Sequence, residues 1–327
     1  MSIILGASVA HEMAAHHFQW IEKGDEMIVL VTGASGFIGS AVTAALERRG
    51  DEVYRLIRPP QLVRSNEIMW NPVEGFLDKS KLRRCDAVIH LAGENLYGRW
   101  TEKKKRRIYQ SRIKSSRLLV DYMADMERRP RVFVAASGVG IYGDRGDEVL
   151  TEDASMGGGF LAEVARDWEA ACREADKLMV RTVQLRFGVV LDADGGALAK
   201  MLPAFSLCLG GPLGSGRQYM PWVSLTDAVN VILFALDNGR VKGPVNVVSP
   251  NAVTNEEFSR TLAQALRRKC FLRVPEFVLR VVFGQVAREV LLASTRAVPQ
   301  KLLDAGFEFR YADLAHCLEA TLKGEME

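Results

Sequence analysis

Apolar runs of strand length alternate with helical patterns over the first 250 residues of the 327-residue chain. Most of these runs are continuous in Val, Ile and Leu rather than alternating, which is typical of parallel strands covered on both faces. The predicted strands are Met27–Thr32, Glu52–Ile57, Ala87–Leu91, Arg131–Ala136, Thr182–Val190 and Val245–Val248. The helical patterns between them are Phe37–Arg49, Glu102–Met126, Phe160–Ala175 and Thr226–Asp237. This order predicts an α/β fold with a doubly wound parallel sheet, whose ligand crevice lies at the carboxyl ends of the strands.

The pattern changes after Asn251, where helical patterns follow one another with few strand signals between them. These patterns are Thr254–Arg267, Pro275–Leu292, Pro299–Ala305 and Asp313–Leu322. We therefore predict a sheet domain at residues 27–250 and a smaller, mostly helical C-terminal cap at residues 251–327. The glycine-rich stretch Gly210–Gly216 is expected to be a loop between cap and sheet, and residues 192–225 are expected to contribute to the substrate side.

Residues 1–26 precede the first predicted strand and are interpreted as an N-terminal extension. Ile3–Ala10 is apolar but short, and no basic residue precedes it, so the pattern does not favour a signal peptide. The extension contains four potential metal ligands, namely His11, Glu12, His16 and His17. The sequence HEMAAH has one residue more than the HExxH zinc motif, which takes its two histidines off a common helix face. We predict no metal site here.

The charge balance of the chain is close to even, with 43 Lys and Arg residues against 40 Asp and Glu residues and a formal net charge of +3. So mild an excess does not indicate a nucleic-acid-binding protein. The one dense basic stretch, Arg99–Arg107, falls on a helical pattern and is interpreted as a solvated helix face, with an anion-binding or nucleic-acid patch as the alternative. We expect no nucleic-acid partner.

The five cysteines are far apart in the chain and never in CxxC spacing, which is typical of reduced thiols in a cytoplasmic protein. No stretch reaches the about 18 uncharged apolar residues that a membrane-spanning helix requires. The most apolar candidate, Pro275–Ala293, is interrupted by Glu276, Arg280, Arg288 and Glu289. We therefore expect no membrane partner. The sequence does not indicate an oligomeric state.

Three glycines follow the first predicted strand directly and open the first predicted helix, in the sequence VTGASGFIG. Gly33 suits a tight turn, Gly36 lets the backbone approach a pyrophosphate, and Gly39 lets the helix pack closely on the strand. The helix then presents the N–H groups of Phe37 and Ile38 to a phosphate. This context predicts a dinucleotide site, and the alternative is a tight strand–helix turn without a ligand.

The end of the second predicted strand favours NADP over NAD. An NAD site has a carboxylate there, about 20 residues beyond the glycines, which binds the ribose 2′-hydroxyl. This chain instead has Arg58 followed by two prolines. A guanidinium suits a 2′-phosphate, and the hydroxyl of Ser35 is a further donor in the glycine turn. The alternative, that Arg58 is only a surface cation, leaves the missing acid unexplained.

The glycine motif is one of a set of short sequences that together resemble a known family. The others are HLAG at His90–Gly93, RW at Arg99–Trp100, SR at Ser111–Arg112, GVGIYG at Gly138–Gly143, FLAEVARDWE at Phe160–Glu169, GGPLGSGRQ, PW, VPEFVLR and AGFEF. The chain resembles the extended short-chain dehydrogenase/reductases and, more narrowly, the "epimerase family protein" subgroup of the NAD(P)-dependent epimerase/dehydratases. That subgroup carries a C-terminal domain of uncharacterised role. The likeness extends from Met27 to Leu322.

This resemblance implies further positions that line the cofactor in a Rossmann-type domain. They are Arg58, Leu91, Ala92, Gly93, Arg112 and Val190. Leu91 and Ala92 end the third long strand, where the backbone passes the ribose and the pyrophosphate. Arg112 occupies a position where relatives often have asparagine, and its guanidinium is expected to reach a pyrophosphate or a substrate carboxylate or phosphate. The alternative for Arg112 is a salt bridge within its helix.

The resemblance does not extend to the catalytic pair of the wider superfamily. There, a Tyr-xxx-Lys pair on one helix acts with a serine or threonine at the preceding strand end. Here Phe160 and Val164 occupy the spacing of the pair. The candidate substitutes are Tyr142 first and Ser137 second, with Glu163 as a third, although packing, capping and solvated roles remain the alternatives for each.

Two functions from different classes follow from these observations. The first is an atypical NADP(H)-dependent oxidoreductase or epimerase that acts on a small polar substrate, such as a sugar or sugar nucleotide. The substrate is expected to lie between the carboxyl edge of the sheet and the helical cap. The second is an NADP(H)-binding sensor or structural protein without turnover, which the missing Tyr-xxx-Lys pair favours.

Overall fold

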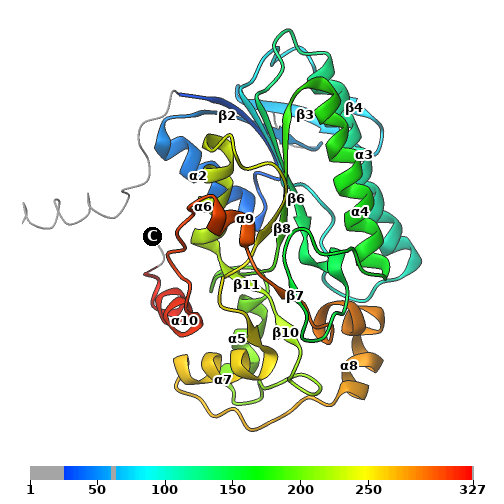
Figure 1. The fold of residues 1–327 in the computed structure, drawn as a ribbon. Helices are drawn as coiled ribbons and strands as arrows, with labels where there is room; N and C mark the ends of the chain where they lie inside the picture. Colours follow the sequence, from blue (N-terminus) through cyan, green and yellow to red (C-terminus); the bar gives the residue numbers. More distant parts are fainter. Residues whose placement is uncertain (1–25, 60–63, 326–327) are drawn as a thin grey trace, which may run out of the picture.

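A computed structural model describes residues 26–59 and 64–325 of the chain, which form a central sheet covered by helices (Figure 1). The sheet has eight strands, in the order β12 (Gly243–Val247), β8 (Arg181–Phe187), β6 (Val132–Gly138), β5 (Ala87–His90), β1 (Ile28–Thr32), β2 (Glu52–Ile57), β3 (Glu67–Asn71) and β4 (Phe76–Leu77). Every neighbouring pair is parallel except β3 and β4 at the edge. The predicted doubly wound α/β fold is confirmed.

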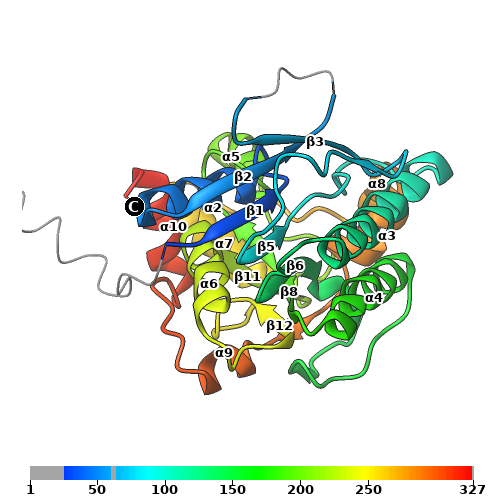
Figure 2. The same cartoon turned by 90° about the horizontal axis from the view of Figure 1, so that it is seen from above.

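Helices cover both faces of the sheet, as Figure 2 shows from above. The helices α2 (Phe37–Arg49) and α6 (Leu225–Asp237) lie on one face, and α3 (Glu102–Ala124) and α4 (Phe160–Arg173) lie on the other. Successive side chains of a strand point to opposite faces. In β1, Val29 and Val31 therefore belong to the core under α2 and α6, whereas Leu30 belongs to the core under α3 and α4. Because both faces are buried, the central strands β1, β5 and β6 are mostly apolar.

The predicted strand Thr182–Val190 is wrong in one respect, since the structure divides it into two strands. β8 ends at Phe187, and β9 (Val189–Leu191) leaves the main sheet to pair with β11 (Trp222–Ser224). A Cβ atom at Gly188 would lie 2.7 Å from the carbonyl oxygen of Pro221. The close approach of these two backbones at a glycine explains the break, which the continuous apolar run conceals.

Several elements of the fold were not predicted. β3 and β4 are short strands toward one edge of the sheet, and in β3 the buried Ile68 and Trp70 alternate with half-buried residues. The helix α5 (Leu198–Ser206) contains Pro203, which argues against a helix in a sequence pattern. Short strands complete the fold at β7 (Val149–Leu150), β10 (Tyr219–Met220), β13 (Val253–Thr254) and β14 (Arg296–Ala297).

The C-terminal region is mostly helical, as predicted. It contains α7 (Asn255–Ala265), α8 (Glu276–Phe283), a π-helical turn at Ala287–Leu291, α9 (Gln300–Asp304) and α10 (Leu314–Lys323). It is also joined to the sheet region, because β14 pairs with β7. In addition, the ring centres of Phe307 and of Phe234 in α6 lie 5.3 Å apart. The cap and the sheet region therefore share parts of one core.

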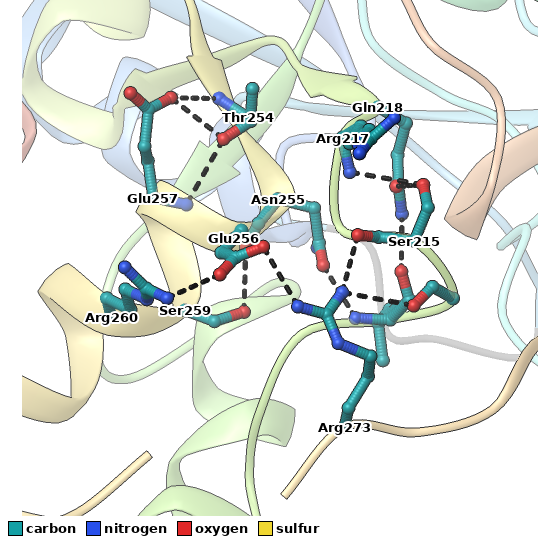
Figure 3. Close-up of polar contacts among 12 residues, drawn as sticks. Ser215, Arg217, Gln218, Thr254, Asn255, Glu256, Glu257, Ser259, Arg260 and Arg273 are labelled. Carbon is teal, nitrogen blue, oxygen red and sulfur yellow. Dashed lines mark hydrogen bonds and ion pairs between the residues drawn. The ribbon is translucent and has the colours of Figure 1, made fainter. Parts of the chain in front are cut away.

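The glycine-rich loop at 210–216 is one of these connections (Figure 3). Arg273 donates from Nη1 to the carbonyl of Gly214 at 3.2 Å and from Nη2 to Oε2 of Glu256 in α7 at 2.9 Å. Asn255, also in α7, accepts a 2.7 Å hydrogen bond from the N–H of Leu213. These bonds hold the loop against the start of α7.

The structure bears on two expectations, those of reduced cysteines and of no membrane-spanning helix. All five cysteines are free, and Cys85, Cys172 and Cys317 are buried. In the described part of the chain, no helix combines the length and apolar character that crossing a bilayer requires. The potential ligands His11, Glu12, His16 and His17 lie outside the described residues.

Candidate functional site

The direction of the chain reverses between β1 and β5. From β1 the chain proceeds outward through β2, β3 and β4, and it then returns to β5 on the other side of β1. The chain leaves β1 and β5 in opposite directions at the carboxyl edge, and α/β sheets form their ligand crevice at such a point. Gly33 follows β1, and Leu91 and Ala92 follow β5. The two loops are in contact where they begin, because a Cβ at Gly33 would lie 2.9 Å from the N atom of Ala92.

The three glycines after β1 have different surroundings. Gly33 has φ +71°, a left-handed conformation that glycine adopts without strain. A Cβ at Gly39 would collide with the carbonyl oxygen of Gly33, so this position holds the helix against the turn. Gly36 is exposed, and the one protein atom within 4 Å of a Cβ there is the oxygen of Gly33 at 3.1 Å. The first and third glycines are closed in by protein, and the second faces open space.

The helix α2 begins at Phe37, directly after Gly36, without a side-chain cap and without an acidic residue in its first turn. The first N–H groups of a helix have no acceptor within the helix, and they carry its partial positive charge. Behind them, the Phe37 ring packs against Gly195 and Gly196, where Cβ atoms would collide with it. Val190, the middle residue of β9, contributes its carbonyl oxygen to the same wall.

The surroundings of this edge are positively charged. Arg58 is exposed at the end of β2 and forms no ion pair within the described residues. Glu94, beyond β5, accepts a 2.7 Å bond from Lys104. That bond, with the charges of Lys104, Arg107 and Arg58, lowers the pKa of Glu94. Ser35 is exposed in the glycine turn itself.

Arg112 reaches this edge from α3. Its Nη1 donates to the carbonyl oxygens of Glu94 and Ile108, both at 3.1 Å, and its guanidinium lies 5.0 Å from the centre of the Trp168 ring. A Cβ at Gly93 would lie 3.1 Å from Cζ of Arg112. Burial lowers the pKa of Arg112 to about 10, so the group is charged at neutral pH. No carboxylate of the described chain pairs with it, and the alternative of a salt bridge within its helix is therefore wrong.

His90, the last residue of β5, is hydrogen-bonded beside these loops. It was not among the predicted site residues. Its Nδ1 lies 2.7 Å from Oγ1 of Thr32, and its Nε2 lies 3.0 Å from Oγ of Ser115. Oγ1 of Thr32 also accepts a 3.1 Å bond from the N–H of Ala92. Burial, with the charge of Arg112, lowers the pKa of His90 to about 3. The ring is therefore neutral and joins the end of β1 to α3.

The two residues predicted to be catalytic lie in a buried network rather than at an open surface. Tyr142 is fully buried, its hydroxyl donates to Oδ1 of Asn246 at 2.7 Å, and it accepts from Nη1 of Arg186 at 2.9 Å. Burial raises the pKa of Tyr142, whereas acid–base work near neutral pH needs a lowered one. Ser137 is buried too, and it donates to Oε1 of Glu169 at 2.8 Å. This geometry argues against both assignments.

The network is organised by an ion pair that the sequence pattern did not reveal. Arg186 in β8 donates from Nε to Oε1 of Glu169 at 2.8 Å and from Nη2 to Oε2 at 2.9 Å. Both side chains are buried, so each charge depends on the other. Ser137 and Tyr142 satisfy remaining acceptors and donors of this pair. The end of β6 is thus part of a structural network.

The start of α4 is covered by apolar and C-terminal residues. The ring of Phe160 packs 5.3 Å from that of Trp100, and Val164 is buried in the same cluster beside Val286. Glu289 from the π-helical turn accepts hydrogen bonds from the N–H groups of Phe160 at 3.2 Å and Leu161 at 2.9 Å. The positions of the missing catalytic pair are thus packed against the cap.

An open pocket of about 560 Å³ lies beside Phe160, where the first half of α3 meets the start of α4 and the cap. Its lining is mostly polar, with Glu102, Lys105, Arg106, Tyr109, Gln110, Gly159, Phe160, Glu163 and Gln285. Glu163, the third candidate from the sequence, is exposed here. It is therefore the one acid–base candidate of the three whose side chain faces a pocket.

The sequence can now be compared with known proteins. A sequence model of the NAD dependent epimerase/dehydratase family matches residues 29–248, which include the glycine turn, the strand ends and the predicted catalytic positions. The chain belongs to this family. A second model, described as a domain of unknown function (DUF1731), matches residues 274–321 in the cap. The resemblance inferred from the motifs is confirmed.

Members of this family in distant organisms are similar to the chain over most of its length. The epimerase family protein Mb2239 of Mycobacterium bovis is 41% identical over 292 residues, which cover 89% of this chain and 96% of that protein. The human epimerase family protein SDR39U1 is 36% identical over 297 residues, which cover 90% and 99% of the two chains.

Solved structures of family members have the same fold. The crystal structure of human SDR39U1 with NADPH superposes with a TM-score of 0.83 at 34% identity and covers 91% of this chain and 99% of that one. A nucleoside-diphosphate sugar epimerase from Corynebacterium glutamicum superposes with a TM-score of 0.76 at 31% identity and covers 91% of this chain and 58% of that one.

Proposed function

We propose that this chain binds NADP(H) along the carboxyl edge of its sheet. The observation that carries the proposal is the difference between the three glycines, because Gly33 and Gly39 are closed in by backbone, while Gly36 is exposed and has a single backbone oxygen beside it. A pyrophosphate needs such an open backbone position beside uncapped helix N–H groups. The residues proposed to hold the cofactor are Gly33, Ser35, Gly36, Phe37, Ile38, Gly39, Arg58, Leu91, Ala92, Gly93, Arg112 and Val190.

The charges at this edge support NADP(H) rather than NAD(H). Arg58 is the charged side chain at the end of β2, and it is exposed without an ion pair in the described chain. A guanidinium there favours a 2′-phosphate over a bare ribose hydroxyl. Arg112, which forms no ion pair in the described chain, supplies a second positive charge beside Gly93 and suits a pyrophosphate or another anion. The human relative crystallised with NADPH supports the same choice.

We further propose that the chain is an atypical oxidoreductase or epimerase of a small polar substrate, in the class of sugars or sugar nucleotides. When bound, the nicotinamide supplies the hydride chemistry. The residues of this chain would bind and orient the substrate and exclude water. The polar pocket beside Phe160 supports a substrate of this kind, because its volume of about 560 Å³ is within the usual range for small-molecule sites. The name of the Corynebacterium relative, a nucleoside-diphosphate sugar epimerase, is consistent with it.

Glu163 is the residue that we propose for proton transfer in such a reaction. It lies on α4 three residues after Phe160 and lines the pocket. The hydroxyls of Tyr142 and Ser137, which the sequence favoured, are engaged with Asn246 and Glu169 instead. A carboxylate with solvent access can exchange protons without breaking a buried network.

A specific observation favours the second function, an NADP(H)-binding sensor or structural protein. The positions of the missing pair, Phe160 and Val164, are packed against Trp100 and Val286. The cap also closes the start of α4 through Glu289. An arrangement that replaces the catalytic pair with packing contacts suits binding without turnover.

The proposed function gives each part of the chain a role. Residues 27–250 would hold the cofactor, and the cap at residues 251–327 would cover the substrate. Residues 192–225 would close the substrate side, which is supported by Lys200 of α5, whose Nζ lies 3.5 Å from the centre of the exposed Tyr97 ring beyond β5. The cytoplasmic location stays a prediction.

One experiment distinguishes these functions. NADPH and NADH are titrated into the protein by fluorescence, and a panel of sugar nucleotides, sugars, aldehydes and quinones is then tested for turnover. Binding of NADPH with a turnover that Glu163→Gln reduces by about 10²–10⁴ supports the enzyme. Tight binding of NADPH without turnover over the panel supports the sensor, and absence of NADPH binding overturns both.

A further inference from the structure

The exposed apolar side chains of this protein are concentrated in one part of the cap. Five of the sixteen large apolar side chains that are exposed in the described chain lie between residues 271 and 282. They are Phe271, Leu272, Phe277, Val281 and Val282. Soluble proteins seldom expose such a cluster without using it for binding. We call these five residues, with Arg267, Arg268 and Lys269, the α8 surface.

The helix α8 presents its apolar side outward. Phe277 and Val281 are 69% and 71% exposed, whereas Leu279 is the one buried residue of the helix. Successive residues of a helix are separated by about 100°, so Phe277, Val281, Val278 and Val282 form a continuous apolar arc. An ordinary surface helix turns such an arc toward the core. Here the arc faces solvent.

The same part of the chain has an excess of positive charge. Residues 266–290 contain six basic residues and two acidic ones, whereas the whole chain has a net charge of +3. Arg273 pairs with Glu256 and Arg280 pairs with Glu276. Three adjacent cations remain, namely Arg267, Arg268 and Lys269, which are exposed and form no ion pair in the described part of the chain.

These residues lie at the rim of the molecule. Figure 1 shows the chain running from α7 along the lower rim to α8 at the edge. The loop that carries the exposed Leu207 and Leu209 continues into this region, since Leu213 bridges to Val274 and Gly211 lies against the backbone of Leu272. The loop after these two leucines is thereby joined to the segment before α8.

We propose that the α8 surface binds the surface of an anionic phospholipid bilayer. Peripheral binding combines apolar side chains that enter the interface with basic residues that meet anionic headgroups. The α8 surface has both components, and the exposed carboxylate of α8, Glu276, is already paired with Arg280. A second copy of the chain is disfavoured, because a twofold contact uses the same patch on both copies and this patch has no unpaired carboxylate for its own three cations.

This proposal differs from the expectation of no membrane partner. That expectation rested on the absence of a stretch long enough to span a bilayer, and a helix that lies on a membrane needs no such stretch. The α8 surface overlaps residues 274–321, the region matched by the domain of unknown function. The proposal gives that region a role that is independent of the cofactor site.

The test is flotation of the full chain with vesicles of phosphatidylcholine alone and of phosphatidylcholine mixed equally with phosphatidylglycerol. We expect binding to the anionic vesicles, little to the neutral ones, and a loss of binding at high salt. A charge-reversed variant should bind at least tenfold less. It combines Arg267→Glu, Arg268→Glu and Lys269→Glu.

An apolar variant, Phe277→Gln with Val281→Gln, should also lose at least tenfold of the binding. Matched controls change the same number of comparable side chains elsewhere. For charge, they are Lys114→Glu, Arg117→Glu and Arg240→Glu together, which are exposed and form no ion pair in the described part of the chain; for exposed apolar surface, they are Val73→Gln and Phe76→Gln together. Both controls should float like the wild type, and thermal unfolding checks that every variant is folded.

Three results overturn the proposal. One is failure of the folded wild-type chain to float with anionic vesicles. Another is binding that the α8 variants and the controls reduce equally. The last is a concentration-dependent dimer, seen by light scattering without lipid, that the apolar variant abolishes, because the occupant of the surface is then a second copy.

Discussion

Oε2 of Glu289 accepts a 2.9 Å hydrogen bond from the backbone N–H of Leu161, a residue 128 positions earlier in the chain. The same carboxylate accepts from the N–H of Phe160 and from the side-chain amide of Gln285. A side chain of the cap therefore satisfies N–H groups at the start of α4, the helix that carries Phe160, Glu163 and Val164. Gly159 makes room for it, since a Cβ there would lie 3.2 Å from Cδ of Glu289.

Removal of this cap should loosen the contact between the cap and α4. We expect Glu289→Ala to lower the free energy of unfolding by about 1 kcal/mol, because two helix N–H groups lose their acceptor. Glu289→Gln should cost less, since an amide oxygen still accepts. Urea unfolding measures both variants. Glu276→Ala, an exposed carboxylate of α8, is the control and should change stability by less than about 0.5 kcal/mol.

Arg58 should determine the choice between the two dinucleotides. If its guanidinium binds the 2′-phosphate, Arg58→Ala removes a charge-assisted pair worth roughly 1.5–3 kcal/mol from NADPH binding and leaves NADH binding nearly unchanged. Fluorescence titration of both cofactors measures the two losses. Arg55→Ala, on the same strand and paired with Glu47, should affect the two cofactors equally. Equal losses for Arg58→Ala would contradict the assignment.

The glycines of the turn should separate binding from folding. Gly36→Val places a branched side chain in the open space proposed for the pyrophosphate, so NADPH binding should be abolished while the protein stays folded. Gly39→Ala should instead destabilise the protein, because its Cβ would collide with the oxygen of Gly33. Calorimetry and NADPH titration measure the two effects. Retained NADPH affinity in folded Gly36→Val would place the cofactor elsewhere.

Most of the central strands were predictable because strands that are buried on both faces have nearly continuous runs of apolar residues. β1, β2, β5, β6 and β12 match predicted runs closely. β3 was missed because its apolar run is only the three residues from Ile68 to Trp70, and α5 was missed because of Pro203. The break at Gly188 depends on the backbone of Pro221, which no local pattern shows.

The cofactor half of the site was predictable for a related reason. A glycine turn is a local requirement of the backbone, and Gly33, Gly36 and Gly39 carry it within seven residues. The polar network is different, because Glu169 and Arg186 come from separate elements and meet only in the folded chain. Tyr142 and Ser137, the expected catalytic residues, are hydrogen-bonded to Arg186 and Glu169 and are buried with them.

Tyr142→Phe and Ser137→Ala should therefore act on stability. Each variant leaves a polar partner in the buried network unsatisfied, which typically costs about 1–3 kcal/mol. Denaturant unfolding measures this loss, and NADPH affinity should stay at the wild-type value. If a substrate is found, turnover per folded molecule should also be unchanged. A fall of about 10²–10⁴ in rate for either folded variant would instead restore it as the acid–base group.

His90 should make the protein less stable in acid. Its pKa is about 3 in the folded chain and about 6.5 in an unfolded one. Between these values the unfolded state binds a proton that the folded state does not. The free energy of unfolding therefore falls as the pH is lowered from about 6.5 toward 3, and above about pH 7 this contribution does not vary.

His90→Gln isolates this effect, because the other titrating groups are common to both proteins. From pH 7 to pH 4.5 the wild type should lose about 2–3 kcal/mol more than the variant, since each pH unit below 6.5 costs about 1.4 kcal/mol. His316→Gln is the matched control, because His316 is exposed, and its pH dependence should follow the wild type. Urea unfolding across this range measures all three proteins. Parallel curves for the wild type and His90→Gln would mean that His90 takes up its proton without unfolding the chain, and the neutral bridge between Thr32 and Ser115 would then be wrong.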